Sequence, residues 1–413
     1  MFCKANFIYF LKSTVLLCFF TFTCLNSQAQ WQQASGIQGG TVNTFAIKDS
    51  IVFAGTDTGG VYSSADNGQH WTAMNNGLAN KNVKSLLVKN NLIVAGISDG
   101  LSSGVSFLST NNGATWSPSS NPYFGILFCL TLKGNDILAG TWYGVSKSSD
   151  NGSSWTTLPD VGLPSNATVT SLAFIGANIF AGVYGSSTDN SGVFLSGDNG
   201  SNWLTRNNGL TDTVITSLAT SGTTIFAGTF SGGVFSSSDN GLYWTAVNTG
   251  LTNLKINTLM VNGTALFAGT DKGIFLSLNN GLNWKAINDS LPANSSVSSI
   301  IVKGEYILAG TAFTVWKRKL IEVVTGLHNE ISEFSQIHIY PNPVTNKLFI
   351  IAASPYISTN VLIEVMDLKG EKLMSFDQRL QNDKPVSIDI SDLGEGIYFL
   401  ILDNKPYKFV KMN

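Results

Sequence analysis

The chain has 413 residues, of which 43% are hydrophobic and only 12% are charged, so it is long enough to bury more than one core. Its net charge of -2 provides no basic surface field, which argues against nucleic acid or a membrane surface as a partner. The 41 glycines are typical of short strands joined by tight turns, and they favour an all-β fold.

The N-terminal segment has the pattern of a secretory signal. Two lysines and an apolar run from Val15 to Leu25 lead into a small-x-small pattern that ends at Ala29. We therefore predict that residues 1–29 are removed by cleavage between Ala29 and Gln30. A membrane anchor is the alternative, but Lys12 leaves an apolar run shorter than the roughly 20 residues that a spanning helix needs.

A phrase of the form Ser-x-Asp/Asn-Asn-Gly, followed three residues later by Trp, recurs along the chain. Its copies are Ser64–Gly68 with Trp71, Ser109–Gly113 with Trp116, Ser148–Gly152 with Trp155, Ser196–Gly200 with Trp203, Ser237–Gly241 with Trp244 and Ser277–Gly281 with Trp284. Successive Trp residues lie from 39 (Trp116 to Trp155) to 48 (Trp155 to Trp203) positions apart, which is the length of one propeller blade. Three strand-like runs precede each copy and a fourth begins at the Trp, so each unit predicts a four-stranded antiparallel blade.

A seventh unit, from Val297 to Lys319, has three strand-like runs but no copy of the phrase. Trp31 stands ahead of the run Val42 to Ile47, just as every other Trp precedes the next unit. We therefore predict that the N-terminal strand completes the seventh unit and closes the ring, which leaves no open sheet edge. The predicted fold is an all-β, seven-bladed β-propeller over residues 30–320.

The phrase resembles the Asp box, or bacterial neuraminidase repeat, of sialidases, sortilin-type receptors, xyloglucan-active glycoside hydrolases and a photosystem II assembly factor. One fold serves all these functions, so the resemblance implies a propeller without a particular activity. We interpret the phrase as structural, because Asp before Asn-Gly suits a turn whose side-chain oxygen accepts backbone N–H groups. Asn111 and Asn279 in place of Asp indicate that the turn needs an acceptor and no charge, and the Trp is expected to pack over the turn.

Ligands are expected on the rim that lies opposite the repeated turns. This rim is built from the loops between second and third strands and the loops between blades. Asp57, Asp99 and Asp271 lie there, and two of them would form the carboxylate pair of a glycoside hydrolase. The simpler interpretation is that loop aspartates beside Gly form turns. The three arginines that a sialidase resemblance implies are missing, because the propeller contains only Arg206 and Arg318. We assign no catalytic residue, metal site or cofactor.

Aromatic residues recur in loops of the same rim: Trp142, Tyr143, Tyr184, Phe230 and Phe313. Exposed rings offer flat surfaces for sugars or anchors for a peptide, whereas the alternative is that they pack between neighbouring loops. The sequence therefore favours a non-catalytic binding or adhesion module that recognises glycan or protein. A polysaccharide hydrolase with paired rim aspartates and an assembly factor with a dedicated partner are the alternatives.

After a polar linker at residues 321–335, the composition changes, and alternating strands and tight turns over residues 336–413 predict a small β-sandwich. The order of Pro341-Asn342-Pro343, the turn Asp367–Lys372 and Gly396 with Tyr398 resembles the type A sorting domain of the type IX secretion system of Bacteroidota. The resemblance implies the type IX machinery as a partner, a secreted or cell-surface location, and removal of the domain with attachment to surface lipopolysaccharide. An immunoglobulin-like accessory domain is the alternative.

Overall fold

The computed structural model describes residues 30–98, 104–120, 125–185, 191–320, 322–323, 337–352, 359–367, 371–380, 385–402 and 405–412. The fold is all-β, and the described residues include the strands β1 to β35. None of the helices in this part of the chain is long and apolar enough to cross a membrane. Ala29, on one side of the predicted cleavage site, and Asp99 lie outside the described residues.

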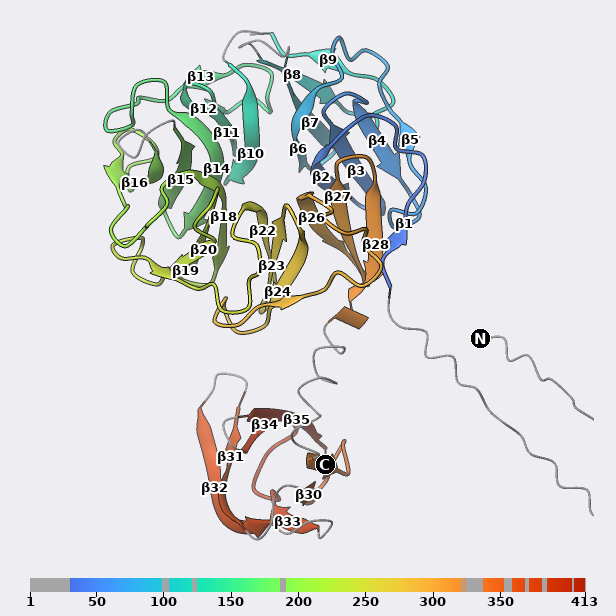
Figure 1. The fold of residues 1–413 in the computed structure, drawn as a ribbon, viewed down its shortest axis with the longest axis vertical. Helices are drawn as coiled ribbons and strands as arrows, with labels where there is room; N and C mark the ends of the chain where they lie inside the picture. Colours follow the sequence, from blue (N-terminus) through green and yellow to red (C-terminus); the bar gives the residue numbers. More distant parts are fainter. Residues whose placement is uncertain are drawn as a thin grey trace, which may run out of the picture.

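Within residues 32–319, the described part of the chain forms seven four-stranded antiparallel sheets that lie around a ring (Figure 1). Sheet 1 contains β2 (Val42–Lys48), β3 (Ile51–Thr56), β4 (Val61–Ser64) and β5 (Thr72–Ala73). Sheet 2 contains β6 (Val83–Lys89), β7 (Leu92–Ser98), β8 (Gly104–Ser109) and β9 (Ser117–Pro118), and sheet 3 contains β10 (Leu127–Lys133), β11 (Asp136–Thr141), β12 (Gly144–Ser148) and β13 (Thr156–Thr157). Sheet 4 contains β14 (Thr168–Ile175), β15 (Asn178–Tyr184), β16 (Gly192–Ser196) and β17 (Leu204–Thr205), and sheet 5 contains β18 (Ile215–Ser221), β19 (Thr224–Thr229), β20 (Val234–Ser237) and β21 (Thr245–Ala246). Sheet 6 contains β22 (Ile256–Asn262), β23 (Ala265–Thr270), β24 (Gly273–Ser277) and β25 (Lys285–Ala286), and sheet 7 contains β26 (Val297–Lys303), β27 (Tyr306–Thr311), β28 (Val315–Lys319) and β1 (Gln32–Gln33).

Sheet 7 joins the two ends of this part of the chain. Strand β1 pairs antiparallel with β28, with Gln32 opposite Lys317 and Gln33 opposite Trp316, so the predicted pairing of the N-terminal strand is confirmed. Trp31 is buried, and its Nε1 donates a hydrogen bond of 2.6 Å to the carbonyl of Ile287, which follows sheet 6. The N-terminal strand thus occupies the place that the fourth strand takes in every other sheet.

The repeated Ser-x-Asp/Asn-Asn-Gly turns connect the third and fourth strands. In sheet 3, Ser148 Oγ donates to Asp150 Oδ1 at 2.8 Å and accepts from the backbone N–H of Gly152 at 2.7 Å. Asn151 adopts a φ of 61°, a conformation that Asn tolerates better than most residues. Asp150 Oδ1 also accepts the N–H of Ser154 at 2.9 Å, so one carboxylate organises the whole turn.

The copies that carry Asn in place of Asp keep the same hydrogen bonds. In sheet 2, Asn111 Oδ1 accepts from Ser109 Oγ at 2.9 Å and from the N–H of Thr115 at 3.0 Å. Asn279 in sheet 6 accepts from Ser277 Oγ at 2.9 Å. The prediction that the turn needs an acceptor and no charge is confirmed.

The Trp of the phrase contacts its own turn, as predicted, and also contacts the preceding sheet; Trp71 Nε1, for example, donates to the carbonyl of Gly68 in its own turn at 3.0 Å. Trp116 Nε1 donates to the carbonyl of Met74, which follows sheet 1, at 2.8 Å. Its ring is buried in one cluster with Phe53 and Val61 of sheet 1. Trp244 repeats the contact on the carbonyl of Arg206 at 2.8 Å. These Trp residues therefore fasten each sheet to the one before it.

Every first strand in the ring contains a register shift of one residue at the same place. Most of the side chains at this bulge donate a hydrogen bond to a carbonyl of the next sheet. These bonds are Asn43 to Val83 (2.8 Å), Thr170 to Ile215 (2.9 Å), Thr216 to Ile256 (2.6 Å), Asn257 to Val297 (3.3 Å) and Ser298 to Val42 (2.8 Å). The two exceptions are Lys84 in sheet 2 and Phe128 in sheet 3.

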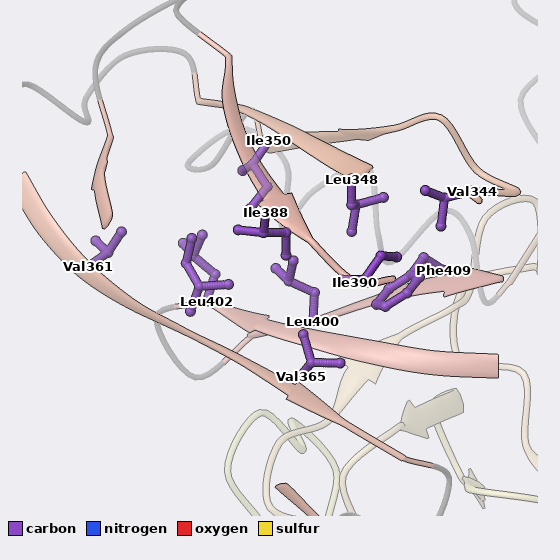
Figure 2. Close-up of a cluster of buried hydrophobic side chains, with 11 residues drawn as sticks. Val344, Leu348, Ile350, Val361, Val365, Ile388, Ile390, Leu400, Leu402 and Phe409 are labelled. Atoms are coloured by element: carbon purple, nitrogen blue, oxygen red, sulfur yellow. The ribbon is translucent and has the colours of Figure 1, made fainter. Parts of the chain in front are cut away.

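The C-terminal region has a hydrophobic core of its own. Strands β29 (Ile337–Tyr340), β30 (Lys347–Ala352) and β33 (Val386–Asp389) form one sheet, and β31 (Thr359–Met366), β32 (Lys372–Leu380), β34 (Gly396–Leu402) and β35 (Lys405–Lys411) form another. Figure 2 shows Leu348 and Ile388 from the first sheet in one cluster with Val365, Leu400 and Phe409 from the second. Both sheets bury apolar side chains in this common core.

We predict that the repeated turns make stability depend on pH in the acid range. Hydrogen bonds from Asn202, together with one from Ser196, lower the pKa of Asp198 from 3.8 to about 2. Because the folded-state pKa is depressed, the stabilisation is present above pH 3.8 and is lost as the pH falls through about 2. Thermal unfolding measured across this range should show a smaller loss for Asp198→Asn, which keeps the acceptor, than for the unaltered chain. An equal loss in both proteins would contradict the assignment.

Candidate functional site

The turns between second and third strands share one rim with the connections between sheets, as predicted. The N–H of Asp57, just after β3, donates to the carbonyl of Thr41 at 3.1 Å, and the N–H of Phe230, just after β19, donates to the carbonyl of Val214 at 3.0 Å. Each of these bonds ties a turn to the connection that leads into its own sheet. Because only backbone atoms take part, the side chains of these turns are available for other contacts.

One position on this rim differs systematically between sheets. It is the residue that follows Ala-Gly-Thr, Ala-Gly-Val or Ala-Gly-Ile at or near the end of each second strand. In sheets 3, 4 and 5 it is Trp142, Tyr184 and Phe230, whereas in sheets 1 and 6 it is Asp57 and Asp271. Three consecutive sheets thus present aromatic rings at equivalent places, and the acidic residues lie on another part of the ring.

Trp142 and Tyr184 line a pocket of about 590 Å³ between sheets 3 and 4. Phe128, the exceptional bulge residue of sheet 3, lines it as well. The remaining lining residues are Ser165, Asn166, Thr168, Thr170 and Gly185. The volume falls within the range of roughly 300–1,000 Å³ that is typical of small-molecule sites. The described lining residues form aromatic walls with hydroxyl and amide groups and include no charged side chain, which suits a neutral ligand.

The rings of the pocket are ordered by mutual contact and remain open to solvent. Phe128 and Trp142 pack with their centroids 6.1 Å apart and an interplanar angle of 32°. Trp142 is 38% exposed and Tyr184 is 44% exposed, which is unusual for large aromatic side chains. Packing between loops therefore accounts for part of the surface of Trp142 and Tyr184, and the remainder is exposed to solvent.

A series of contacts continues from the pocket onto sheets 5 and 6. The ring of Tyr184 meets the ring of Phe230 edge to face, with centroids 6.4 Å apart and an interplanar angle of 82°. Lys255 Nζ lies 4.9 Å from the centroid of the Phe230 ring, within cation–π range. The same ammonium group forms an ion pair of 2.8 Å with Asp271. The aromatic residues of sheets 4 and 5 are thus linked to the acidic residue of sheet 6.

Asp271 is held by several donors. Besides Lys255, its Oδ1 accepts from Asn257 Nδ2 and from Ser296 Oγ, both at 3.0 Å. Burial acts to raise the pKa of Asp271, but hydrogen bonds from Lys255, Asn257 and Ser296 and the charge of Lys255 outweigh it and lower the pKa below 3.8. The carboxylate is therefore ionised at neutral pH, which does not suit a general acid.

The loop aspartate Asp212 has a structural role. Its Oδ2 accepts from the N–H and the Oγ of Ser231, at 2.6 and 2.8 Å, and from the N–H of Gly232 at 2.9 Å. These residues directly follow Phe230, so Asp212 fixes the turn that carries the ring. Asp212, which is not beside Gly in the sequence, therefore stabilises a turn in a neighbouring loop.

Other predicted residues lie outside the pocket. Tyr143 lies beside Gly125, and Phe313, one position later in its turn than the aromatic series, is 78% exposed.

Asp57 is separated from Asp271 by sheet 7, and its buried Oδ1 has no hydrogen-bond partner among the described residues. Burial lowers the pKa of Lys84, and the charge of Asp57 opposes that effect. No group of three or more His, Cys, Asp or Glu in the described ranges is arranged to hold a metal ion.

Phe128 is a pocket residue that the sequence analysis missed. When the seven first strands are aligned on their bulge, the equivalent residues are Asn43, Lys84, Phe128, Thr170, Thr216, Asn257 and Ser298. A single aromatic residue at a position that is otherwise polar was a signal available in the sequence. The sequence analysis considered only residues in the rim loops, and Phe128 lies in a first strand.

Two family models match separate parts of the chain. Residues 153–306 match the DUF6242 β-propeller domain, and residues 338–412 match the secretion system C-terminal sorting domain. This chain is a secreted or cell-surface protein. The sorting domain implies interaction with the type IX secretion machinery. No curated protein matches the sequence.

Several solved structures are similar in fold. One is the extracellular domain of a putative one component system from B. thetaiotaomicron (TM-score 0.59, 16% identity, covering 87% of this chain and 48% of that one), so this chain spans about half of its length. Another is YCF48 bound to a D1 peptide (TM-score 0.57, 14% identity, 71% and 97% covered). A third is the GH74 xyloglucanase of Xanthomonas campestris (TM-score 0.54, 15% identity, 79% and 59% covered). At these identities the similarity establishes the β-propeller fold alone.

We predict that the ion pair beside Phe230 makes a small contribution to stability. Lys255→Met should lower the free energy of unfolding at pH 7 by about 0.5 kcal/mol, because both partners are more than one-third exposed to solvent. Since the pKa of Asp271 is lowered in the folded state, its contribution is present above pH 3.8 and is lost on acidification. Urea unfolding at pH 7 and pH 3 measures both effects, with Lys272→Met as the matched control. A loss that is the same at both pH values would contradict the pairing.

Proposed function

We propose that this protein is a seven-bladed Asp-box propeller that binds glycan at the cell surface and has no catalytic role. In this proposal residues 1–29 are an export signal cleaved between Ala29 and Gln30, residues 30–320 form the propeller, and residues 321–335 link it to a sandwich-like sorting domain at 336–413. The seven four-stranded sheets and the β1–β28 pairing support the blade number. The common core of the two C-terminal sheets supports the sandwich.

The observation that carries the binding proposal is the pocket between sheets 3 and 4. Its aromatic residues, Phe128, Trp142 and Tyr184, expose ring surface on which the apolar face of a sugar can stack. Ser165, Asn166 and Thr168 add hydroxyl and amide groups that hydrogen-bond sugar hydroxyls. A protein ligand would use the same rings as anchors, but the modest volume of about 590 Å³ and the hydroxyl-bearing residues Ser165, Thr168 and Tyr184 favour a sugar.

Two further steps of the proposal concern the fate of the sorting domain. Removal of residues 336–413 during export and attachment of the propeller to surface lipopolysaccharide are what the sorting-domain match suggests. The binding site would then be displayed outside the cell, where glycans are accessible.

A polysaccharide hydrolase remains the second candidate, because one of the similar structures is a xyloglucanase. Against it stand the separation of Asp57 from Asp271 by sheet 7 and the donors that hold Asp271. Incubation of the full chain with xyloglucan and other polysaccharides, followed by a reducing-end measurement, separates the candidates. We expect no release of product. Release that disappears in Asp57→Asn and Asp271→Asn would establish the hydrolase instead.

We predict that Trp142→Ala removes glycan binding. The substitution deletes the ring that packs on Phe128 and removes one wall of the pocket. On a glycan array, the unaltered full chain should bind immobilised glycans to which the variant no longer binds. Tyr243→Ala is the matched control, because Tyr243 is 56% exposed but lies in the repeated turn of sheet 5, outside the pocket. Equal retention by Trp142→Ala and the unaltered chain would refute this site.

We also predict that Phe128→Thr separates binding from stability. Thr is the residue that sheets 4 and 5 carry at the bulge, where its hydroxyl bonds to the next sheet. The variant should gain an equivalent bond to sheet 4, worth about 1 kcal/mol, which offsets part of the lost ring packing. Its thermal unfolding temperature should therefore change little while its glycan affinity falls. An unfolded variant would show that Phe128 is required for the core, contrary to this assignment.

A further inference from the structure

The aromatic surface extends beyond the pocket. Phe230 of sheet 5 meets Tyr184 at a centroid separation of 6.4 Å, and 43% of its surface is exposed to solvent. Tyr184 belongs both to this contact and to the pocket lining. A chain-like ligand seated against Trp142 and Tyr184 therefore has a second aromatic surface next to it, on the adjacent sheet.

The structure holds Phe230 in place from two sides. Asp212 fixes the backbone of the turn through Ser231 and Gly232. Lys255 lies over the ring, and Asp271 in turn holds the Lys255 ammonium at 2.8 Å. A ring fixed before binding loses little conformational entropy when a ligand stacks on it, so its exposed surface is preorganised for contact.

The charges along this surface are balanced. None of the described residues that line the pocket has a charged side chain. Lys255, the cation beside Phe230, is paired with Asp271. A ligand carboxylate placed in the pocket would lose hydration without gaining a charged partner, which is costly. Uncharged sugars do not incur this cost.

We infer that the ligand is a neutral, linear oligosaccharide or polysaccharide bound at two adjoining subsites. The first subsite is the pocket of Phe128, Trp142 and Tyr184, and the second is the exposed ring of Phe230. Lys255 acts as a positioning residue for the second subsite. The inference rests on the proposed glycan-binding function and adds the charge and the chain form of the ligand.

The test is isothermal titration calorimetry of the full chain. The probes are neutral β-1,4-linked gluco-, manno- and xylo-oligosaccharides, from the monosaccharide to the hexasaccharide, with galacturonic acid oligomers of matching length as acidic counterparts. We expect at least one neutral series to bind, with an affinity that rises from the monosaccharide to the longer oligomers. Phe230→Ala should weaken binding of the longer oligomers by roughly two- to tenfold and leave monosaccharide affinity unchanged. Trp142→Ala should remove binding at every length, and Tyr243→Ala should change nothing.

The outcomes separate this inference from the function on which it rests. Absence of binding by every probe, or binding that Trp142→Ala leaves intact, would overturn the proposed site and this inference together. Binding that Trp142→Ala abolishes but that does not increase with chain length, or that Phe230→Ala does not weaken, would overturn the second subsite alone. Tighter binding of the galacturonic acid oligomers would overturn the assignment of a neutral ligand. Lys255→Met should reproduce part of the Phe230→Ala loss for the longer oligomers only.

Discussion

Contacts between neighbouring sheets are the interaction on which the whole propeller depends, because each hydrophobic cluster of the ring draws residues from two sheets. Phe53 of sheet 1 is buried with Phe107 of sheet 2, and Phe267 of sheet 6 is buried with Ile300 of sheet 7. A sheet without a neighbour would expose this apolar surface to water. The ring must therefore close, and the short strand β1 closes it by pairing with β28 although it contains only two residues.

The bulge in each first strand shows that one hydrogen bond between neighbouring sheets can be dispensed with. The hydroxyls of Thr170 and Thr216 donate hydrogen bonds to carbonyls of the next sheet. Phe128 makes no such bond, and its ring lines the pocket. The other contacts between sheets 3 and 4 remain, including the buried packing of Leu138 with Ile179 and Phe194. One junction can therefore lose a polar bond and gain an exposed aromatic surface without opening the ring.

The repeats made much of the fold predictable from sequence. A period of about one blade, strand-like runs and the Ser-Asp-Asn-Gly phrase are local features, and each of sheets 1 to 6 forms from one such unit. The sequence predicted that Trp116 packs over its own turn but did not predict its hydrogen bond to Met74. Met74 belongs to the preceding unit, and no pattern within one unit identifies it. The site was harder still. Trp142 and Tyr184 were expected on the rim, but their convergence with Phe128 depends on how two sheets are turned toward each other.

The difference between the rim residues shows how one fold can present different side-chain chemistry along the same rim. At this rim position, the backbone N–H of Asp57 and that of Phe230 each donate a bond to the connection that leads into their own sheet. An acidic and an aromatic side chain therefore occupy equivalent places with the same support from the fold. Three adjacent aromatic residues produce a surface suited to stacking, while Asp271, on the next sheet, pairs with Lys255 and ends that surface with a neutralised charge. The fold fixes where these side chains stand, and the sequence at a single position in each repeat decides which ligand chemistry that part of the rim can offer.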